Sequence, residues 1–581
     1  MRDFWIMAAV VLVLMISLSV TVSSVEPSAA QETGNTNRDS TEAKIDSIFS
    51  ECNKPASPGA AIVILKDGQT VLSKGYGIAN LDCDIPITPS TVFWVASLSK
   101  QFTAMAITIL EKQGRLSIDD EIHHYLPELP DFGAPITIRH LLHHMSGLRD
   151  DLTMWILAGN QIEDIITQRD LFTLIQHQKQ LNFLPGSKYS YSDTNYLILA
   201  EIVTRVTGES FATWVQRNIF LPLGMTSSCF IVESSRPIRN RAYCYKRNGA
   251  GEFRNVCLNM NYVGATGLLT TAEDMAKWVL NLESGKVGGG EVLKAMLTQG
   301  VLNNGEQITY ARGLRIDSYK DRKVIRHSGT DASFNSHMSY FPDERLGIVV
   351  LSNFESNPWD MADEVADLFL PATDESAGEE LEEGLSESRL EPVAVMLTDD
   401  QLAACAGTYW YSDSWNWLVR HMVVEDNTIY YVRSDDNRSE LIPISENEFL
   451  LADNDKLVVR FSHMENGHFT DLTFNATSQQ PLQAVRVERF EPSEEDLSEY
   501  EGIYYAEELD AMHRLVVRKG EIYNIKFRSE PDTHWRQVVK DRFTFMDGDG
   551  HVTFRRDAQG QIVGYVIDFP RAQNIMFEKL R

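Results

Sequence analysis

A serine and a lysine, Ser97 and Lys100, lie three residues apart at the start of a helical period that runs to Gly114. Side chains three apart at a helix start lie side by side, so the amine can share the serine proton, and the helix N-terminus favours the alkoxide. One such pair is not specific, because roughly one or two arise by chance in a chain of this length. The alternative is a serine cap followed by a solvated lysine.

Two further segments carry chemistry. Tyr191 stands just before an apolar helical run over residues 197–206. It can act as a general base if a cation such as Lys100 lowers its pKa; otherwise it is a core tyrosine. His327 precedes Gly329 on a predicted strand edge, where it can donate to a substrate while the glycine lets backbone approach closely. The alternative there is a surface histidine beside a turn glycine.

In this order the three elements resemble the serine β-lactamase-like family. That family includes class C β-lactamases, D-aminopeptidases, DD-carboxypeptidases and family VIII esterases. The segments that match its other landmarks are residues 137–148, 221–225 and 264–271. The resemblance covers roughly residues 45–370, and the joint occurrence of these motifs is specific.

The resemblance implies a role for each matching residue. Ser97 would be the nucleophile that forms an acyl-enzyme, and Lys100 would help to deprotonate it. Tyr191 would act as base and as proton shuttle to the leaving group. His327 would stand where many β-lactamases have a lysine, with Gly329 keeping the strand open.

The resemblance also implies an oxyanion hole formed by the backbone N–H groups of Ser97 and Thr330, where each donor contributes a few kcal/mol in typical cases. It implies no metal and no cofactor. We therefore expect none.

Two positions depart from the family pattern. Asp193 stands where an asparagine is usual, and a carboxylate there could hold Lys100 but would repel an acyl carbonyl oxygen. Asn195 could compensate for the missing amide. A neutral His327 attracts a substrate carboxylate less than a lysine does, which favours ester or aminopeptidase activity over carboxylate-anchored β-lactams.

The N-terminus indicates export, and the overall charge argues against nucleic acid as a partner. Residues 4–25 form an uncharged, mostly apolar run followed by small residues, which predicts a signal peptide over residues 1–30 and a periplasmic or extracellular protein. The alternative is an uncleaved membrane anchor. Residues 31–42 are polar and are interpreted as a spacer. With 82 acidic and 53 basic residues the net charge is −29, so nucleic acid is not expected as a partner.

The six cysteines show no metal-ligand spacing. An exported chain permits disulfides, and Cys244 with Cys257 is the first pair to test because the two flank a polar loop. Free buried thiols are equally compatible with the sequence.

The C-terminal part contains an internal repeat of short alternating strands. An acidic linker is predicted over residues 372–395. After it, Gly407-Thr408-Tyr409 recurs as Gly502-Ile503-Tyr504, which is a spacing of 95 residues (502 − 407). A unit of this size is typical of a small antiparallel barrel, so we predict two lipocalin-like β-barrel domains, over residues 396–490 and 491–581. Their role is not indicated: they could shape the active-site entrance or be passive modules.

The predicted fold of residues 43–371 is an α/β (α+β) catalytic domain of the β-lactamase/transpeptidase type. It has an antiparallel sheet, built from a hairpin at Asp67-Gly68 and from segments after Arg312 and Lys323, and a helical subdomain over residues 116–207.

The predicted function is that of an exported serine hydrolase that acts through an acyl-serine on a small amide or ester, a D-amino-acid peptide or a short-chain ester. The alternatives are a β-lactamase or DD-carboxypeptidase, and a non-catalytic receptor of the same fold that binds peptides or β-lactams.

Overall fold

The computed structural model describes residues 40–370 and 395–580, apart from gaps at 412–418, 435–436, 453, 476–481, 489–491, 526–531 and 546–549. The signal peptide predicted over residues 1–30 lies outside the described residues, and so does the linker predicted over residues 372–395, apart from residue 395. A helix over residues 40–48 begins inside the stretch predicted as a spacer, residues 31–42. Within the described part of the chain, no helix has both the length and the apolar character needed to cross a membrane.

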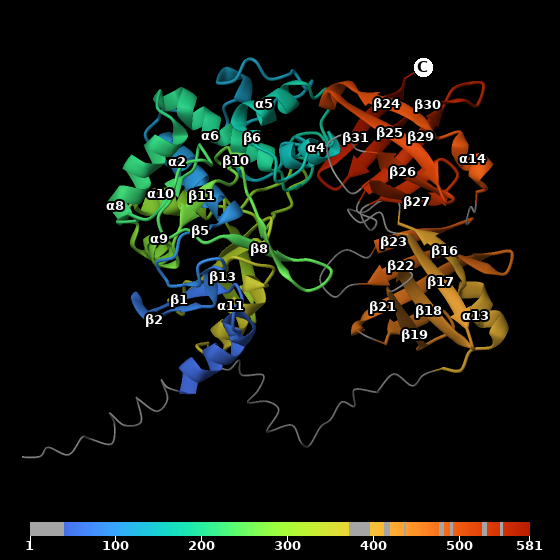
Figure 1. Ribbon diagram of the computed structural model, residues 1–581, viewed down its shortest axis with the longest axis horizontal. Coiled ribbons are helices and arrows are strands. Elements are labelled where there is room, and N and C mark those ends of the chain that lie inside the picture. The colour runs from blue at the N-terminus through green and yellow to red at the C-terminus, as the bar shows by residue number, and fades with distance from the viewer. Residues whose placement is uncertain are drawn as a thin grey trace, which may run out of the picture. The chain divides into compact units, whose positions relative to one another are not determined.

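A six-stranded antiparallel sheet forms one half of the catalytic domain (Figure 1). The first two strands form the predicted hairpin, in which Asp67 and Gly68 both have positive φ, as a tight two-residue turn requires. In sheet order the strands are β12 (Arg315–Tyr319), β13 (Arg322–Asp331), β14 (Phe334–Phe341), β15 (Leu346–Ser352), β1 (Ala60–Lys66) and β2 (Gln69–Tyr76).

Helices cover this sheet on both faces. The helix α9 (Ala272–Ser284) packs on β1 and β15, and α11 (Pro358–Asp367) packs on β14 and β15. All seven residues of β15 are buried, which is the pattern of a strand covered on both sides. A small second sheet contains β5 (Phe93–Trp94), β11 (Leu268–Thr270) and β7 (Cys229–Phe230), and β5 directly precedes the predicted nucleophile in the chain.

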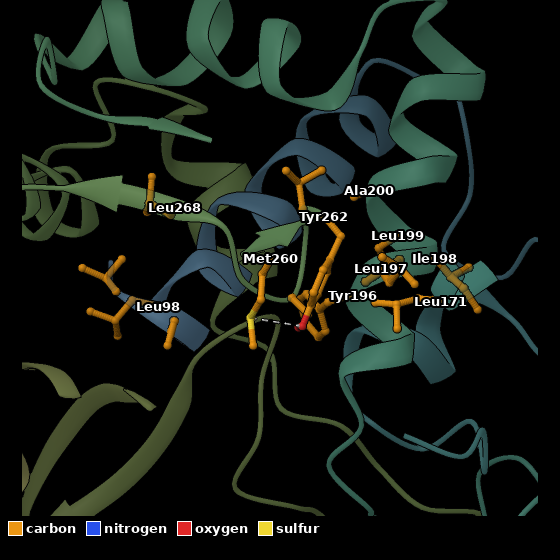
Figure 2. Close-up of a cluster of buried hydrophobic side chains, with 14 of the residues drawn as sticks. Leu98, Leu171, Tyr196, Leu197, Ile198, Leu199, Ala200, Met260, Tyr262 and Leu268 are labelled. Atoms are coloured by element: carbon orange, nitrogen blue, oxygen red, sulfur yellow. Dashed lines mark hydrogen bonds between the residues drawn. The ribbon is translucent and has the colours of Figure 1, made fainter. Parts of the chain in front are cut away.

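The predicted helical subdomain forms the other half. Its helices are α3 (Ile138–Leu142), α4 (Asp151–Leu157), α5 (Gln168–Gln176) and α6 (Asp193–Thr207), and α6 packs against α2 (Ser99–Lys112). Figure 2 shows the apolar cluster that α6 contributes to, in which the Tyr262 hydroxyl donates to Met260 Sδ at 3.7 Å. Because α2 is buried on nearly every side, Ser97 and Lys100 are attached to the core of the domain rather than to its surface.

Two closed eight-stranded barrels follow, so the predicted fold class is confirmed (Figure 1). The repeat holds in detail: the Tyr409 hydroxyl donates to Cys405 O and the Tyr504 hydroxyl to Tyr500 O, four residues back in each case. The first barrel consists of β16 (Gly407–Trp410), β17 (Val419–Glu425), β18 (Thr428–Ser434), β19 (Asn437–Pro443), β20 (Glu448–Leu451), β21 (Asn454–Glu465), β22 (His468–Asn475) and β23 (Leu482–Val487). The second consists of β24 (Gly502–Ala506), β25 (Ala511–Arg518), β26 (Glu521–Ile525), β27 (Thr533–Val539), β28 (Arg542–Phe545), β29 (Gly550–Arg556), β30 (Ile562–Phe569) and β31 (Ala572–Lys579).

The second barrel is joined to the helical subdomain through buried polar contacts. The guanidinium of Arg149, whose side chain is fully buried, forms an ion pair with Glu508 and donates to Asn574 O at 3.1 Å. His513 Nε2 lies 2.9 Å from Leu157 O, at the end of α4. A buried charge of this kind is tolerated only when its partner is present, so the two modules depend on each other here.

The disulfide between Cys244 and Cys257 is not formed, since both are free thiols. Cys244 lies opposite Val256 in the hairpin of β8 (Cys244–Arg247) and β9 (Phe253–Val256). Cys257, one residue further on, is exposed, whereas Cys244 is buried and its Sγ accepts the Ser333 N–H at 3.3 Å. The strand register therefore separates the two thiols.

We predict that Arg149→Met destabilises the docking of the second barrel by about 3–5 kcal/mol, because Glu508 is left buried without its partner. Hydrogen exchange of β31 would measure the change. The matched control is Arg205→Met: that arginine pairs with Glu128 while 43% exposed, and its loss should cost less than about 1 kcal/mol. Equal effects of the two substitutions would contradict the interpretation.

Candidate functional site

Ser97 is presented by a tight turn between β5 and α2. It lies in a short 3₁₀ segment, Ala96–Leu98, and Ala96 has a φ of +48°, which is unfavourable for a residue with a side chain. Hydrogen bonds hold the turn in place: Val95 N–H donates to Leu268 O at 3.1 Å and Ser99 Oγ–H to Ala96 O at 2.6 Å. The surrounding structure therefore fixes the position of the Ser97 hydroxyl.

Lys100 is fully buried beside Ser97 and is charged. Its Nζ lies 3.0 Å from Ser97 Oγ, 2.9 Å from Ala265 O and 2.6 Å from Asp193 Oδ1. Burial alone would lower the pKa of Lys100, but the Asp193 carboxylate and Tyr191 outweigh it and raise that pKa above its usual value. Because the Lys100 ammonium group donates to Ser97 and Ala265 and forms an ion pair with Asp193, it can stabilise an alkoxide at Ser97 but has no lone pair with which to accept the Ser97 proton.

The Tyr191 hydroxyl faces this pair. It is buried and makes no hydrogen bond among the described residues, and Lys100 Nζ lies 4.8 Å from the centre of its ring. Burial raises the pKa of Tyr191, opposed by the charge of Lys100 and by the nearby Ser97. Tyr191 is therefore an uncharged phenol at neutral pH, with its hydroxyl available to a group bound at Ser97.

Asp193 opens α6, where the helix N-terminus favours a carboxylate. Its backbone N–H donates to Asp150 Oδ2 at 2.8 Å, and the backbone N–H of Asp150 donates to Arg571 O at 2.9 Å. Arg571 belongs to the second barrel. A continuous series of polar contacts, which we call the Arg571–Ser97 relay, thus runs from Arg571 through Asp150, Asp193 and Lys100 to Ser97.

Asn195 does not replace the missing amide. Its side chain is buried and engaged elsewhere: Ser146 Oγ–H donates to its Oδ1 at 2.5 Å, and its Nδ2 lies 3.1 Å from His144 Nδ1. The expectation that Asn195 compensates for Asp193 is therefore wrong. The reason is helical geometry: on α6 a residue two positions further on points away from the face that carries Asp193.

His327 is buried and uncharged. Its Nδ1 donates to Ser328 O at 2.6 Å, so its Nε2 accepts the Tyr310 hydroxyl at 2.9 Å. Burial and the charge of Lys100 lower the pKa of His327 to about 3. The imidazole is close to Tyr191, with 6.3 Å between the ring centres, but both of its nitrogens are occupied.

Gly329 allows β13 to lie against the turn that carries Ser97. A Cβ atom at this position would come within 2.4 Å of Val95 O and 2.8 Å of Ser97 N. The strand pairs with β12 only as far as Arg326, so the following residues present a free edge toward Ser97. Thr330, whose N–H is the second predicted oxyanion donor, lies on this edge.

Three carboxyl groups near Lys100, those of Asp150, Asp151 and Asp193, have oxygens within 4.8 Å of one another. Such a group can hold a metal ion, but its charge is already balanced here. Lys100 pairs with Asp193, and burial together with the Asp150 carboxylate raises the pKa of Asp151 well above its usual range, which favours the uncharged form of that carboxyl group. That no metal or cofactor is needed remains a prediction.

The site also contains residues that sequence reasoning missed: His144, Asp150, Tyr310 and Arg571. The ring of His144 lies 4.2 Å from that of Tyr191, centre to centre, and its Nδ1 accepts the Ser192 N–H at 3.2 Å. His144 lies inside the segment 137–148 that matches a family landmark, but the sequence alone does not show that this histidine contacts Tyr191. The other three carry no local sequence signal.

A family model described as Beta-lactamase matches residues 45–370. The chain therefore belongs to the β-lactamase family. Among curated relatives it is 31% identical over 299 residues to a D-aminopeptidase of Gluconobacter oxydans (strain 621H), covering 52% of this chain and 56% of that protein. It is 26% identical over 306 residues to a D-aminopeptidase of Brucella anthropi, covering 52% of this chain and 58% of that one. The chain thus spans little more than half the length of these relatives.

Among solved structures, an octameric penicillin-binding protein homologue from Pyrococcus abyssi superposes with a TM-score of 0.53. It shares 23% sequence identity, and the match covers 77% of this chain and 99% of that one. At this level of identity the likeness supports the fold alone.

We predict that Gly329→Ala lowers the rate at which a fluorophosphonate labels Ser97 by about 100-fold, because a strand displaced by about 1 Å misplaces the groups around the nucleophile. Mass spectrometry of the adduct measures the rate. Gly290→Ala is the control, since a Cβ there meets no atom within 4 Å. Wild-type labelling in Gly329→Ala would show that the strand does not need this close approach.

The neutral His327 should make the domain sensitive to acid. Its pKa in the folded chain is about 3, so the unfolded chain, with an ordinary pKa near 6.5, binds one more proton between these values. The contribution of the neutral His327 to the free energy of unfolding is present above pH 6.5. It is lost as the pH falls toward 3, by about 1.4 kcal/mol per pH unit. In calorimetry, His327→Gln should lose less thermal stability than wild type between pH 7 and pH 5. An identical loss would contradict a neutral His327.

Proposed function

We propose that this protein is an exported serine hydrolase that forms an acyl-enzyme at Ser97 and acts on small amides or esters, of the D-amino-acid peptide or short-chain ester type. The observation that carries the proposal is the buried arrangement of Ser97, Lys100 and Tyr191, with a charged amine 3.0 Å from the serine oxygen and a tyrosine hydroxyl left unpaired. The names of the two curated D-aminopeptidases support the substrate class.

The contacts suggest how the serine proton is moved. Lys100 donates to Ser97 Oγ, so the Ser97 proton is free to point toward the Tyr191 oxygen. As Ser97 Oγ bonds to the substrate carbonyl carbon, its proton passes to the Tyr191 oxygen, and in the same step the Tyr191 proton passes to the leaving nitrogen or oxygen, whose bond to the carbonyl carbon then breaks. Tyr191 then never becomes a phenolate, in keeping with its raised pKa. Water reverses the sequence in deacylation.

Two features stabilise the charge that develops in this step. The Lys100 ammonium faces the serine oxygen throughout. The backbone N–H groups of Ser97 and Thr330 are the proposed donors to the carbonyl oxygen, on the edge that Gly329 keeps close. Asp193 fits this scheme because it holds Lys100 in its charged form.

Export to the periplasm or the extracellular space is part of the proposal. It is supported by the apolar run over residues 4–25 and the small residues that follow.

The test is hydrolysis by purified residues 31–581 of D-alanine p-nitroanilide, p-nitrophenyl butyrate and a chromogenic cephalosporin. We expect turnover of the anilide or the ester that Ser97→Ala abolishes. The control is Ser235→Ala, since that serine is exposed and hydrogen-bonded to Glu233. A preference for the cephalosporin would favour a β-lactamase. A stable adduct at Ser97 without turnover would favour a non-catalytic receptor, and no turnover and no adduct would overturn the proposal.

A further inference from the structure

The turn between β30 and β31 of the second barrel places an arginine at the catalytic site. The backbone of Arg571 is fixed, because its carbonyl accepts the Asp150 N–H at 2.9 Å and the Asn182 Nδ2–H at 3.0 Å. Its guanidinium carbon lies 5.0 Å from the centre of the Tyr191 ring. Arg571 itself is exposed, so the charge faces solvent-accessible space beside Tyr191.

No acidic side chain among the described residues lies within ion-pair distance of this guanidinium. The nearby carboxylates are committed elsewhere: Asp193 pairs with Lys100, and Asp150 accepts from Thr153 and from the backbone of Asp193. They stabilise the charge of Arg571 from a distance without occupying its donors. The five N–H donors of Arg571 are therefore available to a ligand.

A second arginine lies beside Tyr189, which stands two residues before Tyr191 in the chain. Arg315 of β12 is half-buried, and its Nη2 donates to the Tyr189 hydroxyl at 3.4 Å, a long hydrogen bond that leaves its other donors free for a ligand. Its charge and that of Arg571 both act on Tyr189. One guanidinium group thus lies beside Tyr189 and another over the Tyr191 ring, and the Lys100 ammonium group lies 4.8 Å from the centre of that same ring.

We propose that Arg571, with Arg315, binds a carboxylate carried by the substrate, so that this enzyme selects anionic amides or esters. The planar guanidinium matches a carboxylate through two parallel hydrogen bonds. An ammonium group at the same place would be repelled. The neutral His327 leaves the strand edge without a cation, and the second barrel supplies one instead. The inference rests on the proposed function and narrows its substrate class.

The test uses two matched pairs of esters. Mono-p-nitrophenyl succinate and p-nitrophenyl butyrate differ by a carboxylate on the acyl side, whereas 3-acetoxybenzoate and phenyl acetate differ by one on the leaving group. We expect Arg571→Gln to lower kcat/KM by about tenfold or more for the anionic member of at least one pair, with the neutral members within about threefold of wild type. The pair that responds tells which side of the substrate carries the charge. Arg571→Lys should keep part of the preference.

Two controls separate this inference from other effects. Every substitution retains the Arg571 carbonyl, so the hydrogen bond to Asp150 stays, and Arg518→Gln removes an exposed arginine of the same barrel that pairs with Asp532. An equal loss on neutral and anionic esters would make Arg571 a structural residue and overturn the proposal. No selective loss in either pair would also overturn it.

The proposal can be tested even if no ester is turned over. Succinate at constant ionic strength should raise the melting temperature of wild type but not of Arg571→Gln, and the neutral succinamide should raise neither. A failure of Ser97-dependent turnover together with this shift would reject the hydrolase and retain the anion site. No difference between succinate and succinamide in wild type would reject the site.

Discussion

The burial of the Lys100 ammonium group is the constraint on which the site depends. A charge removed from water is tolerated only when acceptors surround it, and here Ser97, Ala265 and Asp193 supply them. Each acceptor comes from a different part of the domain: the turn before α2, the segment before β11 and the start of α6. Their positions are therefore linked, because displacing any one of them would leave the charge unpaired. Substituting aspartate for the usual asparagine strengthens this link, since a full negative charge stands 2.6 Å from the amine.

The second barrel is part of the site, because its contacts hold the residues that pair with Lys100. Asp150 orients Asp193 through the helix start, and the barrel backbone at Arg571 in turn holds Asp150. Arg149, the residue before Asp150 in the chain, also binds the second barrel through its buried ion pair with Glu508. No comparable polar contacts with the catalytic domain involve the described residues of the first barrel. The two barrels are thus similar in topology but differ in their described contacts with the catalytic domain.

The sequence was sufficient for those parts of the structure that local pattern determines. The apolar periods predicted the helices, the Asp67-Gly68 turn predicted the hairpin, and a 95-residue repeat predicted two barrels. Ser97, Lys100 and Tyr191 could be found because their motifs are short and ordered. Asp150 and Arg571 could not, since they are 421 residues apart (571 − 150) and only tertiary packing brings them together. Asn195 and the Cys244–Cys257 pair failed for a related reason: which face of a helix or strand a side chain occupies is decided by the register, not by proximity in sequence.

Because of the Arg571–Ser97 relay, the catalytic domain is not complete without the second barrel. An excised fragment ending at residue 370 would expose the Asp150 N–H and the Arg149 guanidinium to water. Asp150, which accepts the backbone N–H of Asp193 at the start of α6, would then be held less firmly. In this respect the second barrel acts like a second subunit that is part of the same chain. Replacing the second barrel would therefore replace part of the active site, because Arg571 and its contact with Asp150 would be replaced with it.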